Sequence, residues 1–124
     1  HAYAHALRLL QHHPRRELEV EVRSNLALAL LRAGSLGEAA EQADHARALA
    51  PLKPKPAFRH AQVMRAQGNL PEAAASFWEA WRNGGGARAK EEFEACVAGA
   101  RLARAASAGL LASTPQQRAA AQHQ

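Results

Sequence analysis

The chain has 124 residues, which is enough to bury one modest core but not two. Hydrophobic residues make up 48% of it and aromatic residues only 5%, a balance that favours closely packed helices over strands. No run approaches the roughly 18 consecutive apolar residues of a membrane-spanning helix, so we expect no membrane association. Cys96 is the only cysteine, which excludes an internal disulfide and favours a reducing, cytoplasmic location.

Apolar side chains recur at helical spacing along most of the chain and predict six helices in succession. The first, at residues 2–10, is followed by a predicted loop at 11–16 with the sequence QHHPRR. The remaining helices are expected at about residues 16–33, 36–49, 55–67, 71–83 and 87–111. The last residues, 113–124, are polar, and we expect them to form a mobile tail.

Two segments superpose without gaps at a shift of 34 residues, with 24–51 falling on 58–85. Gly34 aligns with Gly68, and each glycine follows one helical pattern and precedes another. Glycine readily adopts the left-handed conformation that ends many helices, so each is predicted to terminate a helix. The residue after each glycine, serine in one copy and asparagine in the other, is a candidate N-cap for the next helix.

A repeated helix–turn–helix unit of 34 residues, with small side chains at the helix crossings, resembles a tetratricopeptide repeat (TPR). The positions that agree with the family's pattern are Leu26, Ala27, Leu30, Gly34, Leu36, Ala39, Ala46 and Pro51 in the first copy, and Ala61, Met64, Gly68, Leu70, Ala73, Phe77 and Ala80 in the second. The second copy departs from it at His60, where leucine is usual, and at Gly85, where proline is usual.

This resemblance implies an all-α fold, a TPR-type solenoid of about two and a half antiparallel helix pairs with a long C-terminal capping helix. The TPR domain would span residues 1–112, before the tail at 113–124. Its expected parts are the second helix of an incomplete first repeat (1–14), a second repeat (16–51), a third repeat (54–85) and the capping helix (87–112). The capping helix would cover the apolar face that a solenoid leaves at its end.

Positive charge is concentrated in the middle of the chain, where residues 45–71 hold five basic side chains and no acidic one. An anionic partner is therefore expected. Lys55 lies four residues before Arg59, so the two share a helix face, where like charges repel at a cost of roughly 0.2–0.5 kcal/mol. Both also lie near the start of their helix, where the helix dipole disfavours cations. Such locally unfavourable choices indicate a binding site for an acidic ligand.

Asn25 occupies the same repeat position as Arg59, 34 residues earlier, and in a TPR-like stack both side chains line the concave groove. Asn25 can donate a hydrogen bond without adding charge, and Arg59 offers a planar fork for a carboxylate. Asn25, Lys55 and Arg59 resemble three of the five residues of the carboxylate clamp in co-chaperone TPR domains, and those of the large immunophilins are most alike. The resemblance implies binding of an acidic C-terminal peptide of the EEVD type from a heat-shock chaperone. The other two clamp residues belong to the first helix of the first repeat, which is expected before residue 1.

Other interpretations stay open. Lys55 and Arg59 also fit an ordinary solvated helix face, and the chain would then be a TPR scaffold subunit that docks within a larger assembly without a working clamp. Phe77 and Trp78 are neighbours that cannot both face inward, which makes Trp78 a possible interface residue. Nucleic-acid binding is not expected, because the basic residues are not interleaved with the aromatic or glycine residues of a stacking platform.

No catalytic motif is recognisable in the sequence, so we expect neither an enzyme nor a cofactor. The adjacent His12 and His13 cannot share a helix face as an i, i+4 metal-binding pair does. His1 and His5 have that spacing, but they stand at the start of what is expected to be a fragment. We therefore expect no metal site. Cys96 falls within the apolar stripe of the last helix, where cysteine usually acts as a small hydrophobic residue.

Overall fold

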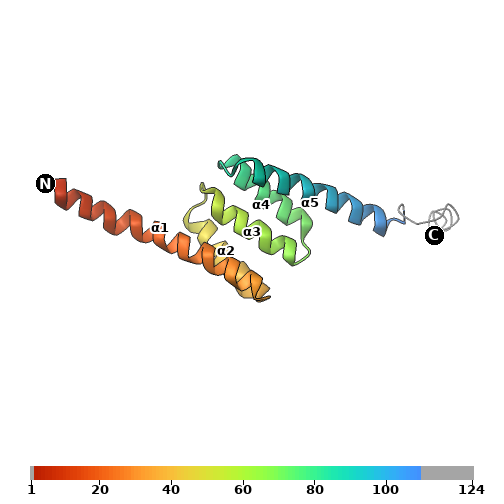
Figure 1. Ribbon diagram of the computed structural model, residues 1–124, viewed down its shortest axis with the longest axis horizontal. Helices are drawn as coiled ribbons and strands as arrows, with labels where there is room; N and C mark the ends of the chain where they lie inside the picture. Colours follow the sequence, from red (N-terminus) through yellow and green to blue (C-terminus); the bar gives the residue numbers. More distant parts are fainter. Residues whose placement is uncertain (1, 110–124) are drawn as a thin grey trace.

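The computed structural model describes the backbone of residues 2–109 and the side chains of residues 15–109. Within this part of the chain the fold is all-α: there are five helices and no strand (Figure 1). The helices are α1 (Ala2–Arg32), α2 (Leu36–Leu49), α3 (Pro54–Ala66), α4 (Leu70–Arg82) and α5 (Gly86–Ser107). The expected all-α class is therefore confirmed.

The first helix differs from the prediction, because α1 continues unbroken from Ala2 to Arg32 through the loop expected at residues 11–16. A proline inside a helix removes one hydrogen bond and crowds the preceding turn, yet a single proline bends many helices without ending them. The flanking residues are mostly good helix formers, and no glycine is present to reverse the chain at Pro14. Figure 1 shows the N-terminal part of α1 extending away from the other helices, so no tertiary packing imposes a turn there.

The helices α2, α3 and α4 begin and end within about a residue of their predicted positions. The last helix starts within a residue of its prediction but ends at Ser107 instead of 111, because Gly109 adopts the left-handed conformation (φ 76°) that ends a helix. The glycine triplet at residues 84–86 separates α4 from α5, as expected. The tail expected at 113–124 lies outside the described residues. The expected boundary between the first and second repeats, at residues 14–16, does not coincide with the end of a helix, because α1 continues through these residues.

Two of the helix connections are built in the same way. Gly34 and Gly68 have φ angles of 82° and 83°, which confirms their predicted left-handed conformation. In each turn the glycine and the next residue donate backbone hydrogen bonds to the last turn of the preceding helix, the pattern of a Schellman motif. Ser35 and Asn69 are the N-cap residues of α2 and α4, although only the Asn69 side chain accepts a bond, from the Glu72 amide at 3.3 Å.

Each helix packs against the next one along the chain, and α1 also contacts α3. Phe77 is fully buried at the centre of a cluster that joins α3, α4 and α5, and Cys96 is buried beside it, as predicted. A second cluster joins α1, α2 and α3 and consists mostly of alanine. Its members Ala27, Ala39 and Ala43 are fully buried, which allows the helix backbones to approach closely.

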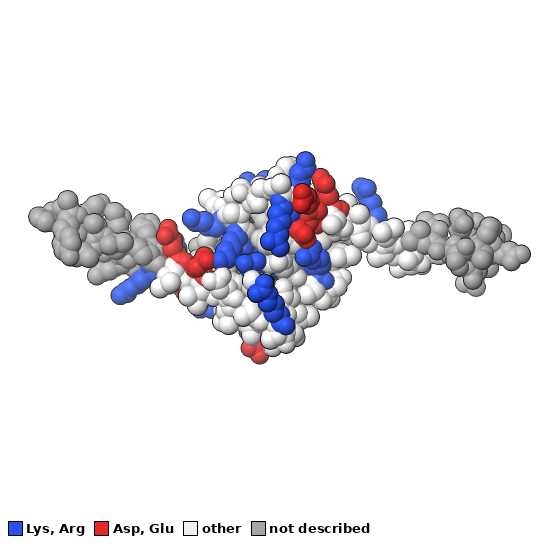
Figure 2. Space-filling view, viewed as in Figure 1, with Lys and Arg blue, Asp and Glu red and all other residues white. Residues whose placement is uncertain are grey.

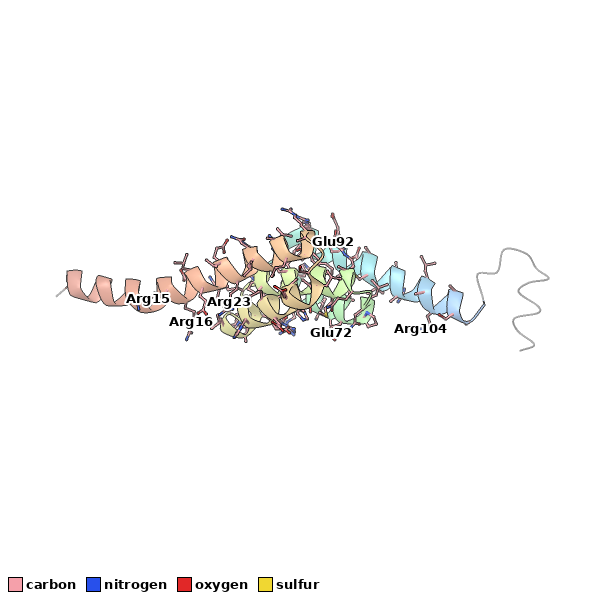
Figure 3. All side chains as sticks on the ribbon, turned by 90° about the horizontal axis from the view of Figure 1, so that it is seen from below. Arg15, Arg16, Arg23, Glu72, Glu92 and Arg104 are labelled. Carbon is pink, nitrogen blue, oxygen red and sulfur yellow. The ribbon has the colours of Figure 1, made fainter. Side chains whose placement is uncertain are left out.

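This packing places α1, α3 and α5 on one face of the molecule. Contacts join α1 to α3, and one hollow is lined by residues of α3 and α5 together. On the other side, α2 and α4 are linked by an ion pair between Arg47 and Glu79, with a distance of 2.7 Å between Nε and Oε2. Figure 3 shows the ends of α1 and α5 extending in opposite directions, with Arg15 and Arg16 on the one and Arg104 on the other.

Candidate functional site

The first turn of α3 brings basic side chains onto the face formed by α1, α3 and α5. Lys53 precedes this helix in an extended conformation (φ −90°, ψ 142°), as expected for a residue before proline. Pro54 occupies the first turn, where a missing N–H donor costs little. The chain therefore enters the helix with Lys55 in its first turn and Arg59 one turn later. In Figure 2 basic side chains gather over the middle of this face, with acidic ones beside them.

Two of the three predicted site residues are in direct contact. Lys55 on α3 donates a hydrogen bond from Nζ to Oδ1 of Asn25 on α1, over 2.9 Å. The same ammonium group forms an ion pair with Glu21, one turn before Asn25 on α1. The structure therefore brings Asn25 and Lys55 into contact and adds the carboxylate of Glu21 to them.

The sequence did not predict Glu21 as a site residue. Residues 45–71 contain no acidic residue, but that count covers only neighbours along the chain and not residues of other helices. Its partner Lys55 lies 34 residues further on, a separation equal to the repeat length. Because α1 and α3 are in contact, residues that share a repeat position on these two helices can meet, so the 34-residue register contained the signal for this pair. The basic stretch is partly neutralised by α1.

Arg59 lies on the same face but makes different contacts. Its Nη1 donates to Oε1 of Gln62 at 2.9 Å, and its buried Nε has no hydrogen-bond partner among the described residues. Burial lowers the pKa of Arg59, the charges of Arg88 and Arg32 lower it further, and Glu21 partly opposes them. No hydrogen bond within the described region joins Arg59 to Asn25 or to Lys55. Its surroundings are thus electropositive and short of acceptors.

Two hollows flank the start of α3. The smaller has a volume of about 250 Å³ and lies between α3 and α5, lined by Pro54, Lys55, Phe58, Arg59, Gly85 and Arg88. The larger has a volume of about 580 Å³ and lies between α1 and the α2–α3 connection. Pro54 and Lys55 line both, so the hollows adjoin at the first turn of α3. Arg88 was not predicted as a site residue, because the glycine triplet before α5 interrupts the repeat register.

Trp78 is exposed on α4 whereas its neighbour Phe77 is buried, in agreement with the expectation that only one of them faces inward. The Trp78 ring centroid lies 5.0 Å from that of Trp81 and 5.6 Å from that of Phe93 on α5. Part of the Trp78 ring therefore packs against its own chain, and 42% of the residue remains exposed. Its role as an interface residue stays a prediction.

A buried polar cluster surrounds His60 on α3, which the sequence marked only as a departure from the TPR pattern. The Nδ1 atom lies 2.7 Å from the Ser76 hydroxyl on α4 and 3.4 Å from Nη1 of Arg47 on α2. The Nε2 atom lies 3.0 Å from Oδ1 of Asp44. A neutral ring with its proton on Nε2 satisfies this arrangement, because Nε2–H donates to the carboxylate while Nδ1 accepts. Since Ser76 is fully buried, the cluster does not present a nucleophile to a substrate.

No group of three potential metal-ligating side chains occurs among the residues that the structure describes. The side chains of His1, His5, His12 and His13 lie outside the described part, so the structure does not bear on them. None of the helices described here is long and apolar enough to span a membrane.

Comparisons with known proteins give no match. No protein-family model matches the chain, and searches of the curated proteins and of the solved structures find no significant similarity.

Proposed function

We propose that the chain is a TPR-type helical solenoid that binds the acidic C-terminal end of a partner protein in the groove formed by α1, α3 and α5. The 34-residue repeat supports this fold, since Gly34 and Gly68 occupy the same left-handed turn between successive helices. As part of the same proposal, α5 closes the last helix pair and the module acts in the cytoplasm as a co-chaperone-like adaptor.

The contact between Lys55 and Asn25 carries the proposal. It brings an ammonium group and a side-chain amide from two different helices to one position in the groove. Arg59 follows one turn later and retains donors without an acidic partner within the described residues. Such a set can hold carboxylates by charge-assisted hydrogen bonds, while the amide contributes a neutral hydrogen bond to the peptide.

An acidic C-terminus of the heat-shock EEVD type supplies the complementary groups, namely a terminal carboxylate and acidic side chains. Short peptides that bind through a few charged contacts typically have micromolar dissociation constants, equivalent to about −8 kcal/mol. Because the groove side chains are partly exposed, the affinity should fall as ionic strength rises.

Isothermal titration of the protein with the peptide MEEVD, as the free acid and as the C-terminal amide, tests the proposal. We expect micromolar binding of the free acid and at least tenfold weaker binding of the amide, since amidation removes one charge from the ligand. Equal affinities for the two peptides would contradict recognition of the terminal carboxylate.

The same titration with Glu21→Gln tests whether the peptide binds at Lys55. Glu21 competes with the ligand for Lys55, so its neutralisation should tighten binding of the free acid about two- to fivefold, the equivalent of roughly 0.4–1 kcal/mol. Glu41→Gln is the matched control, because it removes the same charge from an exposed position on α2, away from the groove. An equal effect of the two substitutions would show that only net charge matters.

The alternative is a scaffold that docks within a larger assembly through apolar contacts. It is favoured by Leu18, Val22 and Leu26, which are spaced four residues apart on α1 and are 64%, 54% and 40% exposed. Side chains at this spacing form one stripe along a helix, and the exposed Trp78 adds a second apolar surface. Under this alternative, neither MEEVD peptide binds and Glu21→Gln changes nothing.

A further inference from the structure

Two helix N-termini meet at the smaller hollow between α3 and α5. Pro54 and Lys55 from the first turn of α3 line one side of it, and Gly85, the N-cap of α5, lines the other. The N-terminal end of a helix carries a partial positive charge and unpaired N–H groups. Here two such ends add to the positive potential of one small cavity, and α5 supplies most of the N–H groups because Pro54 and Pro56 of α3 have none.

Neither end is neutralised by its own helix. The first turns of α3 and α5 contain no acidic residue, and neither helix has a side-chain cap. By contrast, the first turns of α2 and α4 contain Glu38 and Glu72, the usual complement to the helix dipole. Among the four helices α2 to α5, the absence of acidic residues from the first turn is thus confined to the two that meet at the hollow.

Two guanidinium groups line the same hollow, that of Arg59 on α3 and that of Arg88 on α5. The Arg88 guanidinium lies over the Phe58 ring, 5.1 Å from its centroid, a contact that holds it on the wall of the hollow. Within the side chains that the structure describes, no carboxylate forms an ion pair with either arginine. Lys55, the third cation at the hollow, is already paired with Glu21.

We propose that the hollow between α3 and α5 is a carboxylate-binding site in which Arg59 and Arg88 are the ligands. Two planar guanidinium forks and the start of α5 can surround one carboxylate, whereas Lys55 must first release Glu21. If the proposed function holds, this hollow receives a carboxylate of the bound peptide, and Arg88 becomes a binding residue at least as important as Lys55. That assignment rests on the proposed function, but the anion site itself does not.

Titration of MEEVD into Arg88→Gln tests the assignment. We expect the affinity for the free-acid peptide to fall about tenfold or more, because a charge-assisted contact is lost. Arg104→Gln is the matched control, since it removes the same charge from an exposed position near the far end of α5 (Figure 3), and it should change the affinity less than twofold. Circular dichroism confirms that both variants fold.

The peptide variants show which carboxylate enters the hollow. If it is the terminal carboxylate, the penalty of Arg88→Gln disappears with the amidated peptide. If it is a side chain, the penalty disappears with MQQVN, in which both glutamates and the aspartate are replaced. A peptide affinity that Arg88→Gln leaves unchanged, while Glu21→Gln still tightens binding, would overturn the role of Arg88 and leave the proposed function intact.

A second readout does not require a peptide. Sodium acetate is titrated into the protein at constant ionic strength, and the arginine Nε–Hε signals are followed by NMR. We expect saturable shifts of the Arg59 and Arg88 signals and none of the Arg104 signal. Shifts at these two arginines without any MEEVD binding would support the anion site while contradicting the proposed function. Equal, non-saturating shifts at all arginines would overturn the site itself.

Discussion

At the scale of single residues, His60 shows how a buried polar group is accommodated among small apolar ones. The residue is only 4% exposed, and its ring joins α3 to Asp44 and Arg47 on α2 and to Ser76 on α4. Burial lowers the pKa of His60 and the nearby Arg47 charge lowers it further, whereas Asp44, Glu72 and Glu79 act in the opposite direction. Burial outweighs the carboxylates, so the ring is neutral in the folded protein near neutral pH.

This lowered pKa predicts a loss of stability in acid. Below about pH 6.5, the ordinary pKa of histidine, the unfolded chain binds a proton at His60 more readily than the folded one, so the free energy of unfolding decreases as the pH falls. His60→Gln removes the titrating group and keeps a donor and an acceptor, so the difference between variant and wild type should shrink or reverse from pH 7 to pH 5. Urea unfolding at each pH measures it.

His45→Gln serves as the control for this experiment, because His45 is exposed on α2. Its unfolding free energy should follow the pH dependence of the wild type. Parallel pH profiles for His60→Gln and the wild type would contradict this explanation. They would mean that His60 has the same proton affinity in the folded and unfolded states.

At the scale of the helices, the connections are determined locally. The turns at Gly34 and Gly68 close with the same pair of backbone hydrogen bonds, and each places the next helix antiparallel to the last. A left-handed residue is required at both positions, and glycine adopts it without the steric cost that a Cβ atom brings. The helix–turn–helix unit therefore recurs wherever this glycine recurs.

Gly34→Ala tests this requirement, and Gly37→Ala is the control, because Gly37 lies within the first turn of α2 and has no positive φ angle. An added Cβ has no neighbour within 4 Å at either Gly34 or Gly37, so packing contributes nothing at either position. Because Gly34 has a φ of 82°, Gly34→Ala should destabilise the protein by about 1–2 kcal/mol. Gly37 lies inside α2, and Gly37→Ala should stabilise it by up to about 1 kcal/mol. Urea unfolding of both variants gives the sign, and the same sign for both would contradict the conformational explanation.

At the scale of the whole molecule, small side chains allow the helices to approach, and one aromatic side chain fills the space that they leave. Phe77 is fully buried, meets Phe58 edge to face with ring centroids 5.1 Å apart, and lies beneath the Arg65 guanidinium. The Arg65–Glu92 ion pair links α3 to α5 at the same place. The relative position of α3 and α5, and with it the shape of the hollow between them, depends on this cluster.

Phe77→Ala should therefore cost about 3–5 kcal/mol of unfolding free energy, since few of the surrounding alanines can move to fill the cavity. Leu52→Ala is the control: Leu52 is 82% exposed, and its truncation should change stability by less than about 0.5 kcal/mol. Thermal and urea unfolding measure both. A cost for Phe77→Ala as small as that for Leu52→Ala would mean that α4 is not held by this contact.

The sequence by itself determined the all-α class, the bounds of α2, α3 and α4 and the left-handed conformation of Gly34 and Gly68. These features depend on interactions within a few residues, namely apolar spacing, helix-ending glycine and N-cap candidates, and such signals are present in the chain at each point. The same register predicted Asn25 near Lys55, because Asn25 occupies the repeat position of Arg59, which lies one helical turn from Lys55.

The structure shows the continuity of α1 through Pro14, and tertiary contacts alone decided the pairing of Lys55 with Glu21, the burial of His60 and the place of Arg88. Whether a proline bends a helix or ends it depends on what surrounds it, and no other helix packs against the N-terminal part of α1 in Figure 1. The charge partner of Lys55 and the second guanidinium of the hollow come from other helices. Electrostatic interactions act across space, so the charges of neighbours along the chain do not reveal partners that come from other helices.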